Sequence, residues 1–279
     1  MRKQLFRKHG GNMFIHNALI YTEVLKANHP QATIIITHGL AQHSDDYKNV
    51  AKQFNKAGYH VMLYDLRGHG RSQGKRGSIK YYEDYLNDLD FIYTYCEKTF
   101  NFPVFLIGHS MGGILTNLYA LKNPNLKGVI ISAAPYQTPK SLNLFKVIGY
   151  RPWGFLKFKT NFQSPYLSNI PYEPRINPFD IKTFRLRLTG EVLIRGIKNL
   201  RKNIKSYQVP VLLLYGKEDV IVSYQEANHF FEDISSEDKT LKLYPNTKHN
   251  VFQEQKTPEV ISDVIAWIDE HIEHNEKAN

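Results

Sequence analysis

The strongest constraint on the fold of this chain is a regular alternation between short apolar runs and stretches of helical periodicity. The apolar runs, at 32–37, 59–64, 103–107, 128–132, 209–215 and 240–244, have the length of strands. Between and after them, 47–57, 81–99, 111–121, 224–231 and 258–271 place apolar residues at helical spacing. Apolar strands that alternate with helices are typical of a parallel sheet covered on both faces. We therefore predict an α/β doubly wound fold, with an antiparallel extension at 4–26 leading into the sheet.

Two of the expected helices carry signals at their first residues. Ser223 and Glu226 have the spacing of a capping box, in which each side chain accepts a hydrogen bond from the backbone of the other residue. Thr257-Pro258 places a proline at the first helical position, where its missing N–H costs nothing. These signals predict helix starts at about 224 and 258.

One long segment, 136–208, interrupts the alternation. It is rich in Pro, Phe, Tyr, Lys and Arg, and a structureless loop of that length is uncommon inside a compact domain. We predict an inserted cap at 136–208, with 1–135 and 209–279 forming the core. Its last element is expected to be a helix at 191–205, with an apolar face (Leu193, Ile197, Leu200, Ile204) and a basic face (Arg195, Lys198, Arg201, Lys202, Lys205).

The clearest chemical motif is Gly108-His109-Ser110-Met111-Gly112-Gly113, which directly follows one expected strand and begins the next helix. In that context G-x-S-x-G is typical of a nucleophile elbow, a tight turn that projects the serine Oγ above the sheet. A glycine-rich turn without catalytic function is the alternative, and the order of strand, turn and helix argues against it. Ser110 is therefore the candidate nucleophile.

A serine needs a histidine to take its proton and a carboxylate to orient that histidine. Asp219 follows the strand at 209–215, and His249 follows the strand at 240–244, so both lie where catalytic groups gather in such sheets. Their chain order, Ser, then acid, then His, is the one expected for this arrangement. Glu218 is the rival acid, and we favour Asp219.

Two backbone N–H groups are candidates for stabilising an oxyanion. Met111 N–H lies at the start of a helix, and Leu40 N–H lies in His38-Gly39-Leu40, directly after the strand at 32–37. We assign His38 a structural role in this loop rather than that of a base. Cys96, the single cysteine, is expected to be a core thiol.

These motifs resemble the monoacylglycerol lipase and lysophospholipase group of the α/β-hydrolase superfamily. The resemblance rests on 38–44, 65–77, 108–113, Gly216 to Asp219 and the region of His249; Asn177-Pro178-Phe179 is the weak match within 136–208. It implies a mostly parallel central sheet covered by helices on both faces, with an inserted cap or lid. Gln42 and Asn250 depart from the group, in which glutamate is more common at both positions, and His69 is expected to be structural.

The resemblance implies a serine carboxylic ester hydrolase acting on single-chain lipids, monoacylglycerol or lysophospholipid, without cofactor or metal. Other serine acyl hydrolases or transferases, such as a short-chain esterase or a thioesterase, remain open. A catalytically silent lipid-binding scaffold of the same fold is the alternative from another class. A dehalogenase or epoxide hydrolase would need Asp in place of Ser110.

Charge is the unusual feature of the composition. The chain carries a formal charge of +10, and 136–208 holds fourteen Lys and Arg against Glu173, Asp180 and Glu191. A basic, aromatic-rich cap favours contact with anionic membrane or phosphate-bearing lipids, and an ordinary solvated face is the alternative. No nucleic-acid-binding motif is recognisable. A single cysteine, no apolar run of membrane-spanning length and no apolar segment after the basic 1–10 predict a cytoplasmic protein without a signal peptide.

Overall fold

The computed structural model describes residues 8–9, 11–161, 164–170 and 177–276. Apart from Lys8 and His9, the basic stretch 1–10 lies outside the described residues, as do Glu173 and Arg175. In the part of the chain that is described, no helix is both long enough and apolar enough to cross a membrane.

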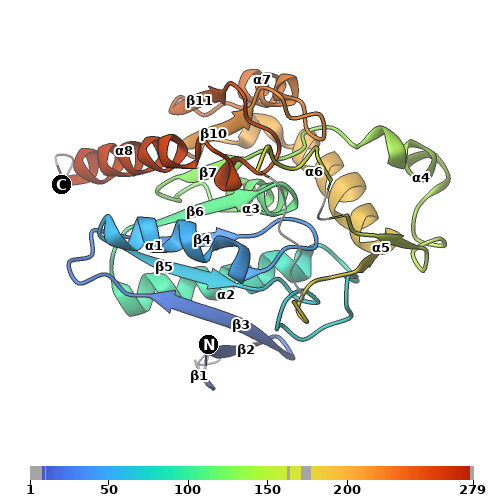
Figure 1. Ribbon diagram of the computed structural model, residues 1–279, viewed down its shortest axis with the longest axis horizontal. Helices are drawn as coiled ribbons and strands as arrows, with labels where there is room; N and C mark the ends of the chain where they lie inside the picture. The colour runs from blue at the N-terminus through green and yellow to red at the C-terminus, as the bar shows by residue number, and fades with distance from the viewer. Residues whose placement is uncertain (1–7, 10, 162–163, 171–176, 277–279) are drawn as a thin grey trace.

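A nine-stranded sheet with the order β1-β2-β3-β5-β4-β6-β7-β10-β11 runs through the molecule (Figure 1). From β5 to β11 neighbouring strands are parallel, whereas β1, β2 and β3 pair antiparallel and β3 joins β5 antiparallel. The predicted antiparallel extension is thus confirmed for the described residues. The strand bounds are β1 Lys8–His9, β2 Asn12–Ile15, β3 Ala18–Leu25, β4 Ala32–Thr37, β5 Tyr59–Tyr64, β6 Val104–His109, β7 Val129–Ser132, β10 Val211–Gly216 and β11 Lys239–Tyr244.

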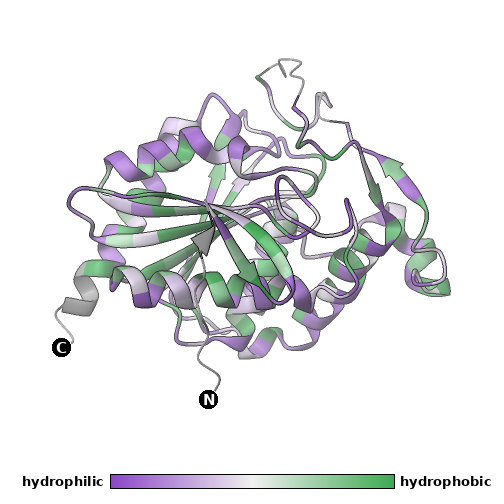
Figure 2. Ribbon diagram, turned by 90° about the horizontal axis from the view of Figure 1, so that it is seen from below, coloured by the Kyte–Doolittle hydropathy of each residue, from purple (hydrophilic) through white to green (hydrophobic). Residues whose placement is uncertain are grey.

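Side chains from alternate strand positions enter two separate cores, one on each face of the sheet. In β4, Ile35 packs in one core while Ile34 and Ile36 pack in the other. Helices α2 (Glu83–Phe100), α3 (Met111–Lys122) and α7 (Tyr224–Asp233) contribute to the first core, and α1 (Lys48–Lys56) and α8 (Thr257–Glu276) contribute to the second. In Figure 2 the strands are predominantly hydrophobic, whereas the helices carry both hydrophobic and hydrophilic residues. The predicted doubly wound arrangement is confirmed.

The segment 136–208, called the insert below, joins β7 to β10. It contains η2 (Lys140–Leu142), α4 (Asn143–Ile148), the antiparallel pair β8 (Lys157–Lys159) and β9 (Thr183–Arg185), and a helical run. The run consists of α5 (Leu186–Thr189), the π-helical η3 (Gly190–Gly196), α6 (Ile197–Lys202) and η4 (Ile204–Ser206). Figure 1 places α4 and α5 at the end of the molecule towards which the parallel strands point.

The helix predicted at 191–205 therefore exists, but it begins five residues earlier and contains a π-helical segment. Ile197, Leu200 and Ile204 are buried against the core, as the apolar pattern predicted. Arg195 does not extend freely from the basic face, because its guanidinium pairs with Glu83 of α2 and with Glu191.

The capping box predicted for α7 is wrong in one half. Ser223 Oγ accepts a hydrogen bond from Gln225 N, as an N-cap should. The Glu226 carboxylate instead accepts from the backbone N–H groups of Tyr136 and Gln137, at 2.8 and 2.7 Å. It thereby connects the beginning of the insert to α7 rather than closing the helix on itself.

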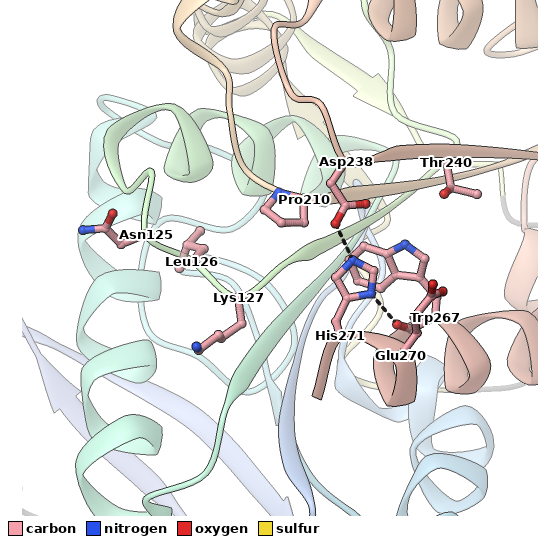
Figure 3. Close-up of a pocket in the computed structure, with 9 residues that line it drawn as sticks. All are labelled: Asn125, Leu126, Lys127, Pro210, Asp238, Thr240, Trp267, Glu270 and His271. Carbon is pink, nitrogen blue, oxygen red and sulfur yellow. Dashed lines mark hydrogen bonds and ion pairs between the residues drawn. The ribbon is translucent and has the colours of Figure 1, made fainter. Parts of the chain in front are cut away.

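The C-terminal part of α8 packs beside the amino ends of β7 and β11, where its residues line a pocket (Figure 3). His271 stacks on Trp267 at a centroid distance of 3.8 Å, and its Nε2 lies 2.8 Å from Asp238 Oδ2, just before β11. Trp267 in turn packs over Gly128, the residue before β7, where a Cβ would lie 2.5 Å from the indole. Together these contacts fasten the last helix to the amino ends of the strands.

Candidate active site

Ser110 lies at the turn between β6 and α3, in a backbone conformation that is unusual for a serine. Its φ and ψ are 51° and −118°, which turn the chain sharply from the strand into the helix. A Cβ at Gly108 would overlap Thr116 Oγ1, and one at Gly112 would overlap Thr37 O. The turn is therefore possible only with glycine at both positions, as the elbow motif requires.

The structure brings the three predicted catalytic side chains together from the ends of different strands. His249 Nε2 lies 2.9 Å from Ser110 Oγ, and His249 Nδ1 lies 2.8 Å from Asp219 Oδ2. His249 is 4% exposed and Asp219 is 5% exposed, so water screens this pairing little. Glu218 is exposed, and its backbone N–H donates to Thr247 O. The geometry thus favours Asp219 as the partner of His249.

A second histidine, His109, lies directly behind this site and received no role in the sequence analysis. Its ring centroid is 5.0 Å from that of His249, and its Nδ1 lies 3.1 Å from Ser132 Oγ at the end of β7. Burial, together with the neighbouring His249, holds the pKa of His109 well below its ordinary value of 6.5. The ring that packs beside His249 is therefore neutral and places no second positive charge next to it. Its position at the last residue of β6, directly before Ser110, is the signal that could have identified it.

The loop after β4 is held in place by side chains that converge on Gly39. The carboxamide oxygen of Gln42 accepts hydrogen bonds from Gly39 N at 2.9 Å and from Tyr47 OH at 2.8 Å. Gln42, one of the two departures from the resembled group, thus serves the loop itself. Leu40, which follows Gly39, and Ser110 line one and the same cavity.

His38 has both ring nitrogens engaged within the protein. Its Nδ1 lies 2.8 Å from Gly39 O, and its Nε2 accepts from Leu66 N–H at 2.9 Å. This bonding fixes the tautomer with the proton on Nδ1 and connects the loop after β4 to the turn 65–77. His69, in that turn, is fully buried and packs against His38. Both histidines have the structural surroundings that were expected for them.

The backbone N–H groups of Leu40 and Met111 remain available at this site. Among the residues that the structure describes, neither group donates to a protein acceptor. Met111 N–H belongs to the first turn of α3, where the helix dipole favours negative charge. Both groups are thus free to bind an oxygen that develops charge.

A cavity of about 230 Å³ opens beside Ser110. Its walls come from the loop after β4, the elbow, the His249 loop and the insert. The lining residues are Gly39, Leu40, Gln42, Asp46, His109, Ser110, Leu167, Ile221, His249, Asn250 and Gln253. In the described part of the chain, no group of three or more His, Cys, Asp or Glu is arranged to hold a metal ion.

Residues 28–256 match the family model described as serine aminopeptidase, S33. The chain belongs to this family of α/β hydrolases. A monoglyceride lipase of Homo sapiens is 29% identical over 250 residues, which cover 86% of this chain and 82% of that protein. A monoacylglycerol lipase of Mycolicibacterium smegmatis is 27% identical, with 87% and 90% covered, and a phospholipase of Bacillus subtilis is 26% identical, with 88% and 98% covered.

Solved structures confirm the fold of this hydrolase. The crystal structure of a monoacylglycerol lipase from Paleococcus ferrophilus superposes with a TM-score of 0.78 at 25% identity, covering 90% of this chain and 99% of that one. A soluble variant of the monoglyceride lipase from Saccharomyces cerevisiae, in complex with a substrate analogue, gives a TM-score of 0.81 at 20% identity, covering 93% and 94%. The predicted α/β-hydrolase fold is therefore correct.

In this hydrolase the insert is attached to the loop that carries His249. Asn250 N–H donates to Leu167 O at 2.8 Å, and Lys248 Nζ donates to Pro165 O at 2.8 Å. The buried Glu254 accepts with one carboxylate oxygen from both Asn169 N at 2.8 Å and Lys248 N at 3.1 Å. Residues 164–170 thus lie against the His249 loop, and Leu167 forms part of the cavity wall.

Proposed function

We propose that this hydrolase is a serine esterase that cleaves single-chain lipid esters, monoacylglycerols or lysophospholipids, through an acyl-enzyme on Ser110. The observation that carries the proposal is the pair of hydrogen bonds that joins Ser110 Oγ to His249 and His249 to Asp219. The lipid substrate class is supported by the relatives, which are named monoacylglycerol lipase, monoglyceride lipase and phospholipase.

In the first half of the reaction, His249 Nε2 takes the proton of Ser110 as Oγ attacks the ester carbonyl carbon. The carbonyl π electrons move to its oxygen, and the N–H groups of Leu40 and Met111 stabilise the charge that develops there. Asp219, bonded to Nδ1–H, stabilises the imidazolium and keeps the ring in the required tautomer. The tetrahedral intermediate then expels the alcohol, which receives its proton from His249 Nε2.

The second half repeats these steps with water in place of serine. His249 takes a proton from water as the water oxygen attacks the acyl carbon, and it returns the proton to Ser110 Oγ as the fatty acid leaves. Each half begins and ends with His249 neutral, so the cycle consumes one water and restores the enzyme.

We assign 136–208 the role of a cap that covers the site and contacts the acyl chain. Support comes from Leu167, which lines the cavity beside Ser110, and from the bonds of 165–169 to the His249 loop. The cap also supplies exposed cations, Lys198 and Lys202 on α6, for contact with an anionic membrane. Changing both to Glu should lower binding to anionic vesicles and spare hydrolysis of a soluble short-chain ester.

Labelling with a fluorophosphonate probe tests the nucleophile directly. The wild-type chain should be labelled, and Ser110→Ala should not, whereas Ser132→Ala should still react because the hydroxyl that it removes is bonded to His109. Labelling that persists in Ser110→Ala would place the reactive serine elsewhere. Absence of labelling in the wild type would favour the silent lipid-binding scaffold.

A hydrolysis panel tests the substrate class. Monoacylglycerols and lysophospholipids of graded chain length should be cleaved faster than matched thioesters and than p-nitrophenyl acetate. A preference for the thioester or for the shortest acyl chain would instead support a thioesterase or a short-chain esterase. Full activity after treatment with EDTA is expected, since none of the proposed steps uses a metal.

A further inference from the structure

A second cavity, of about 620 Å³, lies between the core and the insert, away from the residues that line the Ser110 cavity. One wall comes from the turn after β5 and the start of α2, and the other from the insert around α4 and β9. The lining residues are Arg67, Lys75, Ser78, Ile79, Lys80, Asp84, Arg151, Pro152, Gly154, Phe155, Arg185 and Arg187. The two cavities have no lining residue in common.

The walls of this second cavity are strongly basic. Six of the lining side chains are cations, and among the described residues Asp84 is the single carboxylate that faces them on the wall. Two further carboxylates lie behind the wall: Asp88 pairs with Arg67 at 2.6 Å, and Glu191 lies 3.3 Å from Arg151 and 3.7 Å from Arg187. They neutralise part of the charge and hold these guanidinium groups in place.

Three cations of the wall have no carboxylate partner in the described part of the chain. Across the described residues, no carboxylate oxygen lies within 4.0 Å of Lys75, Lys80 or Arg185. Arg185 Nη1 donates to Phe155 O at 3.1 Å, a bond that orients the guanidinium without neutralising it. Like charges gathered around one hollow repel one another, and an anion in the hollow would relieve that repulsion.

The walls are joined by hydrogen bonds, so the cavity has a defined shape. Arg185 N–H donates to Gly77 O at 2.8 Å, and the Arg187 guanidinium donates to Lys80 O through Nε at 3.2 Å and Nη2 at 2.9 Å. The ring of Tyr81 lies within 6 Å of three cations, at 5.3 Å from Lys80, 5.6 Å from Arg151 and 5.9 Å from Arg187. Three of the cations are thus gathered around one aromatic ring.

We propose that this cavity binds a phosphate group carrying at least two negative charges, either on a soluble phosphate ester or on a lipid headgroup. A phosphate group has several anionic oxygens that accept hydrogen bonds, and guanidinium and ammonium groups are suitable donors for them. Arginine in particular makes paired, charge-assisted hydrogen bonds to phosphate. A volume of 620 Å³ leaves room for an organic part beside the phosphate, and Pro152 and the exposed Phe155 offer it an apolar wall. Since the ligand bridges core and insert, its binding stabilises their attachment, whatever chemistry Ser110 performs.

Titration of the full chain with inorganic pyrophosphate, followed by calorimetry at low salt, tests the soluble source. Lys75→Gln/Lys80→Gln should bind pyrophosphate at least about tenfold more weakly than the wild type, because it removes two charge-assisted contacts. Both lysines are exposed, so the fold should be retained. The matched control is Lys52→Gln/Lys56→Gln, which removes two exposed lysines from α1 and should bind within about twofold of the wild type.

Flotation with phosphatidylcholine vesicles, with and without phosphatidic acid, tests the lipid source on the same variants. Binding of either probe that depends on Lys75 and Lys80 but not on Lys52 and Lys56 supports the site, and the probe that binds identifies the source. Arg185→Gln, a second change on the other wall, should weaken the same probe, and Ser110→Ala should bind as the wild type does. If the wild type binds neither probe, or if both lysine pairs weaken binding equally, the site is refuted.

Discussion

The carboxylate of Asp219 makes three hydrogen bonds that leave it one available orientation. Oδ2 lies 2.8 Å from His249 Nδ1, while Oδ1 accepts from the backbone N–H groups of Ile221 and Val222 at 2.8 and 2.9 Å. The loop after β10 therefore holds Oδ2 of Asp219 in a fixed position against His249 Nδ1, which is what an orienting acid must do.

Asp219→Asn should lower the rate of ester hydrolysis by about 10⁴-fold, because an amide stabilises the wrong imidazole tautomer. Steady-state kinetics on a soluble ester measure this loss, with a circular dichroism melt to check the fold. The neighbouring Glu218→Gln is the matched control and should retain nearly full activity, since Glu218 is exposed. Loss of activity in Glu218→Gln with retention in Asp219→Asn would transfer the acid role to Glu218.

The predictions for single residues were wrong where a side chain bonds to a residue far away in the sequence. Glu226 bonds to Tyr136 N and Gln137 N, some 90 positions earlier, and Arg195 bonds to Glu83 over 112 positions. Both residues fit a local pattern, a capping box and a basic helical face. The local pattern could not show that a partner from another element would be closer than the helix or the solvent.

At the scale of elements, one buried side chain attaches the insert to the His249 loop. Glu254 is 3% exposed, and its Oε1 accepts from Asn169 N of the insert and from Lys248 N beside His249. A buried carboxylate that serves two backbone donors is costly to remove, because both N–H groups then lose their acceptor. The position of His249 thus depends on a contact outside the catalytic residues.

Glu254→Ala should destabilise the fold by about 1 to 3 kcal/mol and reduce kcat, since two partly buried backbone N–H groups lose their acceptor. Glu254→Gln keeps an acceptor oxygen and should recover most of both losses. Urea unfolding and kinetics on a soluble ester measure the two effects. The control is Glu259→Ala, which removes an exposed carboxylate paired with Lys256 and should change stability by less than about 1 kcal/mol. Equal behaviour of the 254 and 259 variants would contradict the anchoring role.

The contact between α8 and β7 yields a second test at this scale. Gly128→Ala would place a Cβ 2.5 Å from the Trp267 ring, which cannot withdraw because His271 stacks on it. The expected cost is about 1 to 3 kcal/mol of unfolding free energy, measured by urea unfolding. Gly196→Ala, whose Cβ would meet the flexible end of Leu118 at 3.2 Å, is the control and should cost less. A Gly128→Ala protein as stable as the wild type would show that α8 adjusts freely.

The elements that the sequence predicted well are those in which a regular pattern of apolar residues marks the buried positions. The strands β4, β5, β6 and β10 are buried at every position, and such continuous apolar runs located them to within two residues. The elbow followed from its glycines, and the partners of Ser110 followed from the strand ends. The insert was less predictable, because the π-helical turn at Gly190–Gly196 and the pair β8–β9 depend on contacts with the core rather than on a repeating pattern.

For the molecule as a whole, buried histidines predict sensitivity to acid. Burial is the main reason why the pKa of His38, His69 and His109 lies below the ordinary value of 6.5. Below about pH 6.5 the unfolded chain therefore binds protons at these positions more readily than the folded chain does. The stability they contribute is therefore present above this pH and lost as the pH falls, by at most about 1.4 kcal/mol per pH unit for each histidine.

Urea unfolding at pH 7.5, 6.5 and 5.5 measures this slope. His69→Gln should make it shallower by up to about 1.4 kcal/mol per pH unit, since one buried histidine with a strongly lowered pKa is gone. His29→Gln removes an exposed histidine and should leave the slope of the wild type. Identical slopes in all three proteins would show that the buried histidines take up protons without unfolding.

The attachment of residues 164–170 has a consequence for how this enzyme can evolve. Three of its bonds to the catalytic loop use main-chain atoms of the insert: Pro165 O, Leu167 O and Asn169 N. Main-chain atoms are present whatever side chain a position carries, so substitutions at Leu167 can reshape the wall beside Ser110 without detaching the segment. The shape of this cavity can thus change under mutation while the arrangement of Ser110, His249 and Asp219 is inherited unchanged.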